Sequence, residues 1–508
     1  MSKGKKKIVT LVSLCLLMAA AICLYFFLPK GETDDEEDSS AEVVNVVNID
    51  KEKITAVHIQ PEDGEEISLS KEGEDWKLEG LPEAPVDAEA VEAMFEGLSP
   101  VTSSKELEAG ESGLSEYGLD KPQMTVQFTT SDGEQYEFKF GGSVPVKGGN
   151  YGLFSSSDKV YTFTDTLLSA FQVERNSLIV KEEVAEINAD YLTYISVKNG
   201  TEDTFEAKIV SDDEKVDAYT NWIISKPYKK PLAGSCTNDW NTLQGFFTSV
   251  SFQELAEYDC QDFSKYGLDQ PAASAEVKYF ELKDGYELPE TTAEPASSSQ
   301  ANKNTNKTSL VPEKYRDNKS YTLYIGDKTD EGDYYVRLKG SDHVYTMSGE
   351  SVESITGVDA YTYMDHSVYS TLATDIKGYE VTLGESGKKI TVTHSTEKGD
   401  DDKEKNVWTL NGKAVSDENE EAFLTPYSKA FLLEFTSSAK ASVKPESKKP
   451  VLTAVYHEEG RDVTVTYYPY DGTNFYRVDK NGMDYFLVDK LAVDDVIEAF
   501  ASLLELDQ

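Results

Sequence analysis

The sequence predicts an α+β protein in which three tandem, mainly antiparallel sheet domains, each with one packed helix, follow one N-terminal transmembrane helix. The prediction depends first on landmarks that occur three times along the 508 residues. In each copy a tryptophan opens a strand-like segment, and a proline with Ser or Thr at plus three follows 42 to 49 positions later. These pairs are Trp76 with Pro122, Trp222 with Pro271, and Trp408 with Pro450. Each copy is far longer than a solenoid repeat, so we interpret the copies as whole small domains.

A second set of landmarks supports the same division. Aromatic residues ten positions apart end each copy with a hairpin-like pair: Tyr151 and Tyr161, Tyr335 and Tyr345, Phe475 and Tyr485. We therefore predict repeat domains at residues 49–173, 174–358 and 359–508, after a tail and anchor at 1–29 and an acidic linker at 30–48. Each predicted domain is long enough to bury a core of its own.

The first two copies share a nearly identical hexapeptide. It comprises Tyr117, Gly118, Asp120 and Pro122 in copy one, and Tyr266, Gly267, Asp269 and Pro271 in copy two. Glycine permits a positive φ, and proline forces the preceding residue into an extended conformation. The hexapeptide is thus predicted to be a turn that leads into a strand, and a structural role outweighs a ligand contact. Copy three has lost the glycine and keeps only Pro450.

Within copy one, the alternation of apolar and polar residues predicts each element in order. A three-stranded meander is expected at 54–59, 66–70 and 76–78, followed by a helix at 88–98 with Asp87 as its N-cap. After the turn, strands are expected at 125–128, 136–140, 151–154 and 160–163, then a short helix at 166–171. Copies two and three follow the same order, with a helical pattern at 240–247 in copy two.

Two polar stretches interrupt this order. Residues 287–319 are rich in Ser, Thr, Asn, Glu and Lys, and residues 397–406 are similarly polar. Such segments bury too little apolar surface to offset the entropy lost on ordering. We predict a disordered insertion at 287–319 and a solvated loop at 397–406.

The N-terminal segment is predicted to anchor the chain. Residues 8–28 are 21 uncharged, mostly apolar residues, enough to cross a hydrocarbon core of about 30 Å. Four lysines precede the run and an acidic stretch at 34–38 follows it, which places the N-terminus in the cytoplasm and the domains outside the membrane. A cleaved signal peptide is the competing interpretation, and a lipoprotein at Cys15 or Cys23 is another, but neither has the expected cleavage site.

The charge of the chain bears on its partners. With 93 acidic and 49 basic residues, the formal net charge is −44. Such a surface repels nucleic acid and anionic lipid head groups. We therefore expect no nucleic-acid partner, and contact with the membrane only through the N-terminal helix.

The sequence shows no pattern of catalytic or metal-binding chemistry. Its five histidines have no metal-ligand spacing, and the glycines and lysines of 384–389 lack the first Gly and the final Ser or Thr of a phosphate loop, which favours a hairpin turn. The glycine-rich segment 141–149 is interpreted as a flexible connection. Cys236 and Cys260 are consistent with a disulfide or with two unpaired thiols. We predict no catalytic residue, no metal and no cofactor.

The hexapeptide, the strand-opening tryptophan and the membrane anchor together resemble the bacterial "domain of unknown function 4340" family. The segment 175–179 resembles the link between units in that family, and the resemblance is weaker over residues 359–508. It implies a membrane-anchored extracytoplasmic protein associated with ABC-type transporter components, and no catalytic residues. Two function classes follow: an accessory or scaffold subunit of a transport complex, and a cell-surface enzyme or ligand-binding protein acting on envelope material.

Overall fold

The computed structural model describes residues 43–506 except 109–112, 146–147, 156, 185, 211–220, 236–237, 287–310, 385, 399–403 and 440–447. The predicted anchor and most of the acidic linker, together with Cys15, Cys23 and Cys236, lie outside the described residues. No helix of the described part is both long enough and apolar enough to cross a membrane.

The chain divides into two compact units, residues 1–175 and 176–508. The predicted boundary between 173 and 174 lies two residues from this division. The predicted boundary at 359 lies inside the second unit, after the second sheet and before the third. Below, the segments around the three sheets are called repeats 1, 2 and 3.

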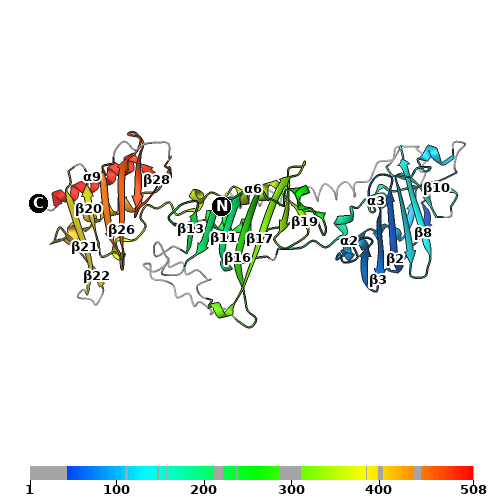
Figure 1. Cartoon of the computed structure of the whole chain (residues 1–508), viewed down its shortest axis with the longest axis horizontal. Coiled ribbons are helices and arrows are strands. Elements are labelled where there is room, and N and C mark those ends of the chain that lie inside the picture. Colours follow the sequence, from blue (N-terminus) through cyan, green and yellow to red (C-terminus); the bar gives the residue numbers. More distant parts are fainter. Residues whose placement is uncertain are drawn as a thin grey trace, which may run out of the picture. The chain divides into compact units, whose positions relative to one another are not determined.

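In repeat 1, the described residues form a sheet of eight strands in the order β4-β3-β2-β7-β8-β9-β10-β6 (Figure 1). The strands are β2 (Ile54–Pro61), β3 (Ile67–Glu72), β4 (Asp75–Leu78), β6 (Glu106–Glu108), β7 (Met124–Thr130), β8 (Gln135–Ser143), β9 (Asn150–Phe154) and β10 (Lys159–Phe163). A separate pair joins β1 (Val44–Val47) to β5 (Val101–Ser103).

In repeat 2, nine described strands have the order β14-β13-β12-β11-β16-β17-β18-β19-β15. They are β11 (Leu192–Asn199), β12 (Glu202–Ile209), β13 (Trp222–Lys226), β14 (Leu232–Ala233), β15 (Leu255–Glu257), β16 (Ala273–Leu282), β17 (Arg316–Lys328), β18 (Tyr334–Leu338) and β19 (Val344–Met347).

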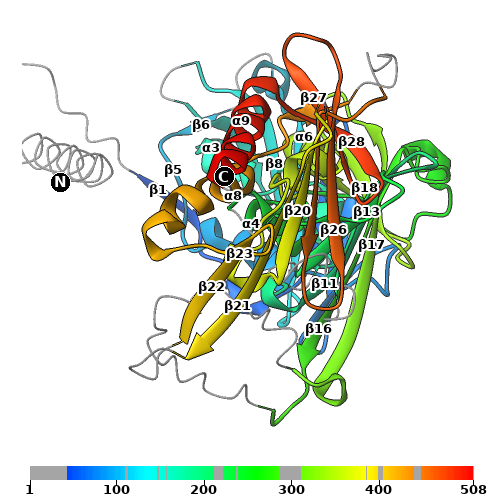
Figure 2. The ribbon, with the colours of Figure 1, turned by 90° about the vertical axis from the view of Figure 1, so that its left-hand side faces the viewer.

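In repeat 3, the nine strands among the described residues have the order β23-β22-β21-β20-β25-β26-β27-β28-β24 (Figure 2). They are β20 (Gly378–Leu383), β21 (Lys389–Lys398), β22 (Glu404–Leu410), β23 (Lys413–Ala414), β24 (Ser437–Ser438), β25 (Leu452–His457), β26 (Asp462–Pro469), β27 (Phe475–Lys480) and β28 (Met483–Asp489).

The three sheets share one connectivity, and the strand pairs described in them are antiparallel. The first strand of each sheet (β2, β11 or β20) lies inside the sheet, between the second strand of its meander and the strand that follows the turn. A short strand from the segment before the turn (β6, β15 or β24) then pairs with the last strand of the repeat. The prediction of several mainly antiparallel sheets is confirmed.

Helices pack on one face of each sheet. Repeat 1 has α2 (Ala88–Ala93) and α3 (Asp165–Ser169), repeat 2 has α4 (Asn238–Thr248) and α6 (Gly349–Thr356), α7 (Ala360–Tyr363) follows α6, and repeat 3 has α8 (Glu420–Phe431) and α9 (Lys490–Leu506). The packing buries aromatic rings: Phe128 of β7 lies 5.9 Å from Phe95 and 5.5 Å from Phe171, centroid to centroid. The short helix predicted at 166–171 is confirmed as α3, whereas the prediction of a single packed helix for each domain was too low. The face opposite the helices is called the open face.

Several predicted boundaries need correction. The predicted helix 88–98 ends at Ala93, and a 3-10 turn at Glu96–Leu98 follows it, although Asp87 caps it as expected and accepts a hydrogen bond from the Ala90 N–H. The insertion predicted at 287–319 includes the first residues of β17, where Lys319 pairs with Tyr279. The loop predicted at 397–406 includes paired strand residues, Glu397 with Lys405 and Thr396 with Asn406. In both places strand pairing extends into polar sequence, because an antiparallel ladder needs only backbone groups.

Candidate functional site

The shared hexapeptide forms the same turn in both repeats. A 3-10 helix ends at Tyr117 in repeat 1 and at Tyr266 in repeat 2, and the next residues, Gly118 and Gly267, have φ of 69° and 66°. This left-handed conformation favours glycine. Each turn then places a leucine in the core and leaves the following residue, Asp120 or Asp269, exposed.

The tyrosines of the turns pack against the sheet. The Tyr117 ring lies 4.9 Å from that of Tyr151, and the Tyr266 ring lies 4.7 Å from that of Tyr335. The Tyr266 hydroxyl donates to Glu257 at 2.7 Å, and burial together with this hydrogen bond raises the pKa of Tyr266. Pro122, Pro271 and Pro450 are half-buried at or near the starts of β7, β16 and β25. The tyrosines and prolines of these landmarks therefore have structural roles in the fold.

Close contacts with backbone oxygen atoms explain why glycine occupies three further positions, 141, 326 and 384. A Cβ on Gly141 would lie 2.3 Å from the Tyr117 carbonyl oxygen, and one on Gly326 would lie 2.1 Å from that of Tyr266. Gly384, directly after β20, has a close backbone contact of a different kind, because its Cβ would lie 2.0 Å from the Pro450 carbonyl oxygen. Gly141 is therefore a packing residue in β8, which corrects the prediction of a flexible connection. The prediction of a hairpin turn after Gly384 is confirmed by the pairing of β20 with β21.

The three landmark tryptophans are buried, with exposed fractions of 4%, 7% and 3% for Trp76, Trp222 and Trp408. They lie on the corresponding strands β4, β13 and β22. Trp222 is the first residue of its strand, whereas Trp408 is the fifth residue of β22. The Trp408 indole stacks on His394 at 4.2 Å and donates to Glu420 at 3.2 Å.

Other candidate residues stay apart. Among the described residues, no group of three or more His, Cys, Asp or Glu side chains is placed to hold a metal ion. Cys260 is a buried free cysteine whose neighbours include Leu268 and Val344. Burial raises the pKa of its thiol.

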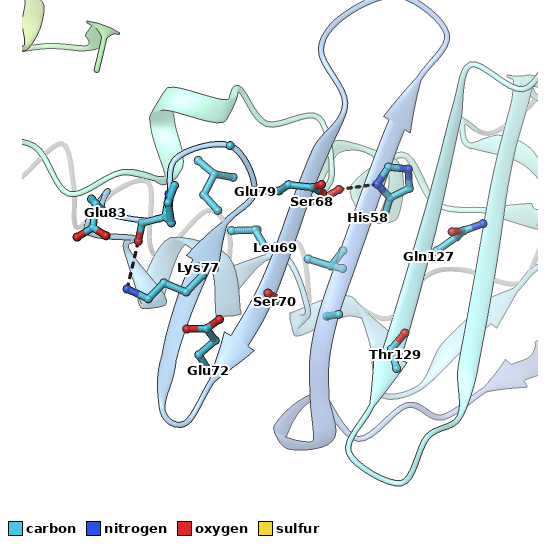
Figure 3. Close-up of a pocket in the computed structure, with 15 residues that line it drawn as sticks. His58, Ser68, Leu69, Ser70, Glu72, Lys77, Glu79, Glu83, Gln127 and Thr129 are labelled. Atoms are coloured by element: carbon cyan, nitrogen blue, oxygen red, sulfur yellow. Dashed lines mark hydrogen bonds between the residues drawn. The ribbon is translucent and has the colours of Figure 1, made fainter. Parts of the chain in front are cut away.

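A groove with a volume of about 610 Å³ lies on the open face of repeat 1 (Figure 3). Strands β2, β3, β4 and β7 form its floor, and the segment 79–83 after β4 forms one wall. The polar side chains in the groove are His58, Ser68, Ser70, Glu72, Lys77, Glu79, Glu83, Gln127 and Thr129.

The strand alternation produces this groove. Val57 and Leu69 point into the core and are about 2% exposed, so their neighbours in sequence face the open side. Ala56 is opposite Ser70 on one strand and Thr129 on the other, and His58 is opposite Ser68 and Gln127. The short side chain of Ala56 leaves space between longer polar neighbours.

Hydrogen bonds organise the groove. His58 Nδ1 lies 2.9 Å from Ser68 Oγ, and Lys77 Nζ donates to the Pro82 carbonyl at 3.3 Å (Figure 3). Arg175 holds the wall in place, donating at 2.6 Å to the Glu79 carbonyl and at 2.6 Å to the Glu65 carboxylate. The groove thus has a built polar floor and a wall that is tied to the end of the repeat.

The arrangement suits recognition better than catalysis. The His58–Ser68 pair has the separation of a base and a nucleophile. However, Ser68 lies within a regular strand, where its carbonyl accepts from the Glu79 N–H and its neighbours pair with β2. Nucleophilic serines in hydrolases instead lie on sharp turns beside free backbone N–H donors. The groove offers hydrogen-bond donors and acceptors at fixed positions.

Sequence reasoning did not find this groove. Its floor depends on which residues of four strands lie side by side, and this register is not visible in the sequence of one repeat. One signal in the sequence could have indicated the groove. Ala56 is a small residue at an outward-facing position of its strand, where the neighbouring outward positions are polar.

Comparison with known proteins identifies a family but no function. Neither curated proteins nor solved structures gave a match. The model of one family, the domain of unknown function DUF4340, matches residues 76–271 and again 222–444. The two overlapping matches cover most of the chain and include Trp76, Trp222 and both copies of the turn. From this coverage and the repeated fold, we conclude that the chain belongs to the DUF4340 family.

Proposed function

We propose that the protein is a membrane-anchored extracytoplasmic accessory subunit of an ABC-type transport complex, in which the repeats supply contacts and not chemistry. The observation that carries the proposal is the threefold recurrence of one sheet topology with helices on one face and polar residues on the other. Tandem modules on one anchor raise the affinity for a multi-subunit partner through effective concentration, without a strong individual contact.

The three open faces present different chemistry on this common frame. At corresponding central positions, repeat 1 has His58 and Ser68, repeat 2 has Ser196 and Glu206, and repeat 3 has Glu380 and Thr391. Sheets that share a fold but differ on one face are suited to contact different subunits of an assembly. An enzyme, in contrast, concentrates its chemistry in one site.

The test is purification of the full-length protein from membranes in mild detergent, followed by mass spectrometry. We expect an ATPase and a multi-span permease in stoichiometric amounts, and a weaker association after deletion of residues 359–508. The variant Ala56→Tyr should fill the groove and weaken the association. The matched control is Gln60→Tyr, which adds the same ring to the same face of β2 at an exposed position outside the groove. Recovery of the protein without transporter subunits would contradict the proposal.

A cell-surface enzyme is the second candidate, and the His58–Ser68 pair within the groove favours it. Turnover of envelope material that is lost in Ser68→Ala and in Glu72→Gln would establish this alternative. Under the accessory role, exchange of a single carboxylate for its amide should barely change assembly.

A further inference from the structure

Repeat 2 can be compared with the groove of repeat 1, because strand pairing relates the two sheets residue by residue. Trp76 pairs with Lys71 of β3, and Trp222 pairs with Ile209 of β12. Two residues before these partners, Leu69 pairs with Val57, and Ala207 pairs with Ile195. Val57 and Ile195, both buried, are therefore equivalent. The preceding residues, Ala56 and Tyr194, then occupy the same position on the open face.

In repeat 2 the Tyr194 side chain lies across the area that corresponds to the groove. Its hydroxyl donates to Glu206 at 3.2 Å, and Glu206 is the equivalent of Ser68. Lys278 Nζ lies 4.4 Å from the ring centroid, a cation–π contact, and Lys278 is opposite Tyr194 as Thr129 is opposite Ala56. Burial raises the pKa of Tyr194, so its hydroxyl remains a donor. Repeat 2 thus holds a tyrosine of its own at this place.

We propose that the groove of repeat 1 binds a tyrosine side chain from an extended segment of a partner protein, in the place that Tyr194 fills in repeat 2. This rests on the proposed role of repeat 1 as a contact surface. Ala56 provides the space, and Ser68 with His58 provides the polar partner that Glu206 provides for Tyr194.

The groove itself favours a protein partner over a glycan. The described residues that line it include no Phe, Tyr or Trp on which a sugar ring could stack. Its polar side chains lie in rows across β3, β2 and β7, and Gln127 extends the row that contains His58 and Ser68. A tyrosine ring placed over Ala56 would have its hydroxyl group beside this row of polar side chains. Burial of such a ring removes about 150–250 Å² of surface from water.

The test uses ligand-observed saturation-transfer NMR with the full-length protein in detergent and the peptide N-acetyl-Gly-Tyr-Gly-amide. We expect saturation of the tyrosine ring protons, lost in Ala56→Tyr and retained in Gln60→Tyr. The corresponding phenylalanine peptide should bind about 2- to 10-fold more weakly, the factor associated with one neutral hydrogen bond. Equal signals from the wild-type protein and Ala56→Tyr, or no signal from either, would overturn the proposal. Displacement of the peptide by N-acetylglucosamine would identify the groove as a glycan site instead.

A second variant keeps the test decisive if Ala56→Tyr fails to fold. Tyr194→Ala removes the internal tyrosine of repeat 2, and p-cresol should then bind in its place and restore stability lost by the variant. Absence of this rescue would also overturn the proposal, because the position from which it is argued would then not accept a free phenol ring. If transporter subunits co-purify equally with the wild-type protein and Ala56→Tyr while no peptide binds, this inference fails and the accessory role stands.

Discussion

The substitution Gly326→Ala tests the contact between the turn and the sheet in repeat 2. The new Cβ would lie 2.1 Å from the Tyr266 carbonyl oxygen, whereas Cβ atoms essentially never approach a heavy atom within 3.0 Å. The carbonyl must therefore retreat by about 1 Å, and overpacking of this kind costs about 1–3 kcal/mol. The retreat would also strain the 2.7 Å bond from the Tyr266 hydroxyl to Glu257. We expect a loss of 1–3 kcal/mol in the free energy of unfolding, by the same estimate.

The measurement is urea denaturation followed by tryptophan fluorescence, with hydrogen exchange at the amides of Gly267 and Leu268 to localise the effect. These amides bond to the carbonyls of Ser264 and Phe263 within the turn. Gly245→Ala is the control: Gly245 lies in α4 with nothing within 4 Å of its Cβ position, so alanine there should stabilise the helix by about 0.5–1 kcal/mol. If Gly326→Ala stays within about 0.5 kcal/mol of wild type, the turn is not clamped as described.

Four further predictions concern repeat 3 and the anchor. Burial raises the pKa of Tyr379, Tyr427 and Tyr456 in repeat 3, so these groups favour folding in their neutral form. Stability should be fully present below their unfolded pKa of about 10 and fall as the pH rises above it, as urea midpoints at pH 9 and 11 would show. Among the described residues Tyr379 has no partner for its buried hydroxyl, so Tyr379→Phe should keep or raise stability, and a large loss would contradict this. Trp408→Ala should cost about 3–5 kcal/mol in urea denaturation, and an unchanged midpoint would refute its place in the core. The full chain should stay with membranes after high-salt and carbonate washes, whereas a soluble fragment beginning near Gly31 would indicate a cleaved signal.

Sequence reasoning succeeded where the physical cause is local. The alternation around Val57 and Leu69 identified strands, and glycine followed by proline identified the turn at Gly118. It failed for β5 and β6, because strands of three residues are too short to show alternation. It also extended the first helix beyond Ala93, because the apolar stripe continues into the 3-10 turn.

The groove lies beyond such reasoning for a different reason. Ala56 is exposed in a concave site only because Ser70 and Thr129 stand opposite it on two other strands, and Thr129 is far from it in sequence. A pattern within one strand cannot show this. Only a comparison between repeats, which requires the ladder of each sheet, identifies Tyr194 as the residue that Ala56 replaces.

The central position of the first strand has a consequence for synthesis on the ribosome. In each sheet a residue of this strand pairs with one that is synthesised much later: Val57 with Phe128, Ile195 with Val277, and Val381 with Ala454. The middle of the sheet can form only after the later residue has been synthesised. Until then the nascent meander has an unpaired edge, which is a template for any complementary strand. Three repeats of one connectivity on one chain therefore risk exchanging halves with one another. Because the three sequences differ, a half-sheet meets other side chains on a wrong partner strand than on its own, which disfavours such an exchange.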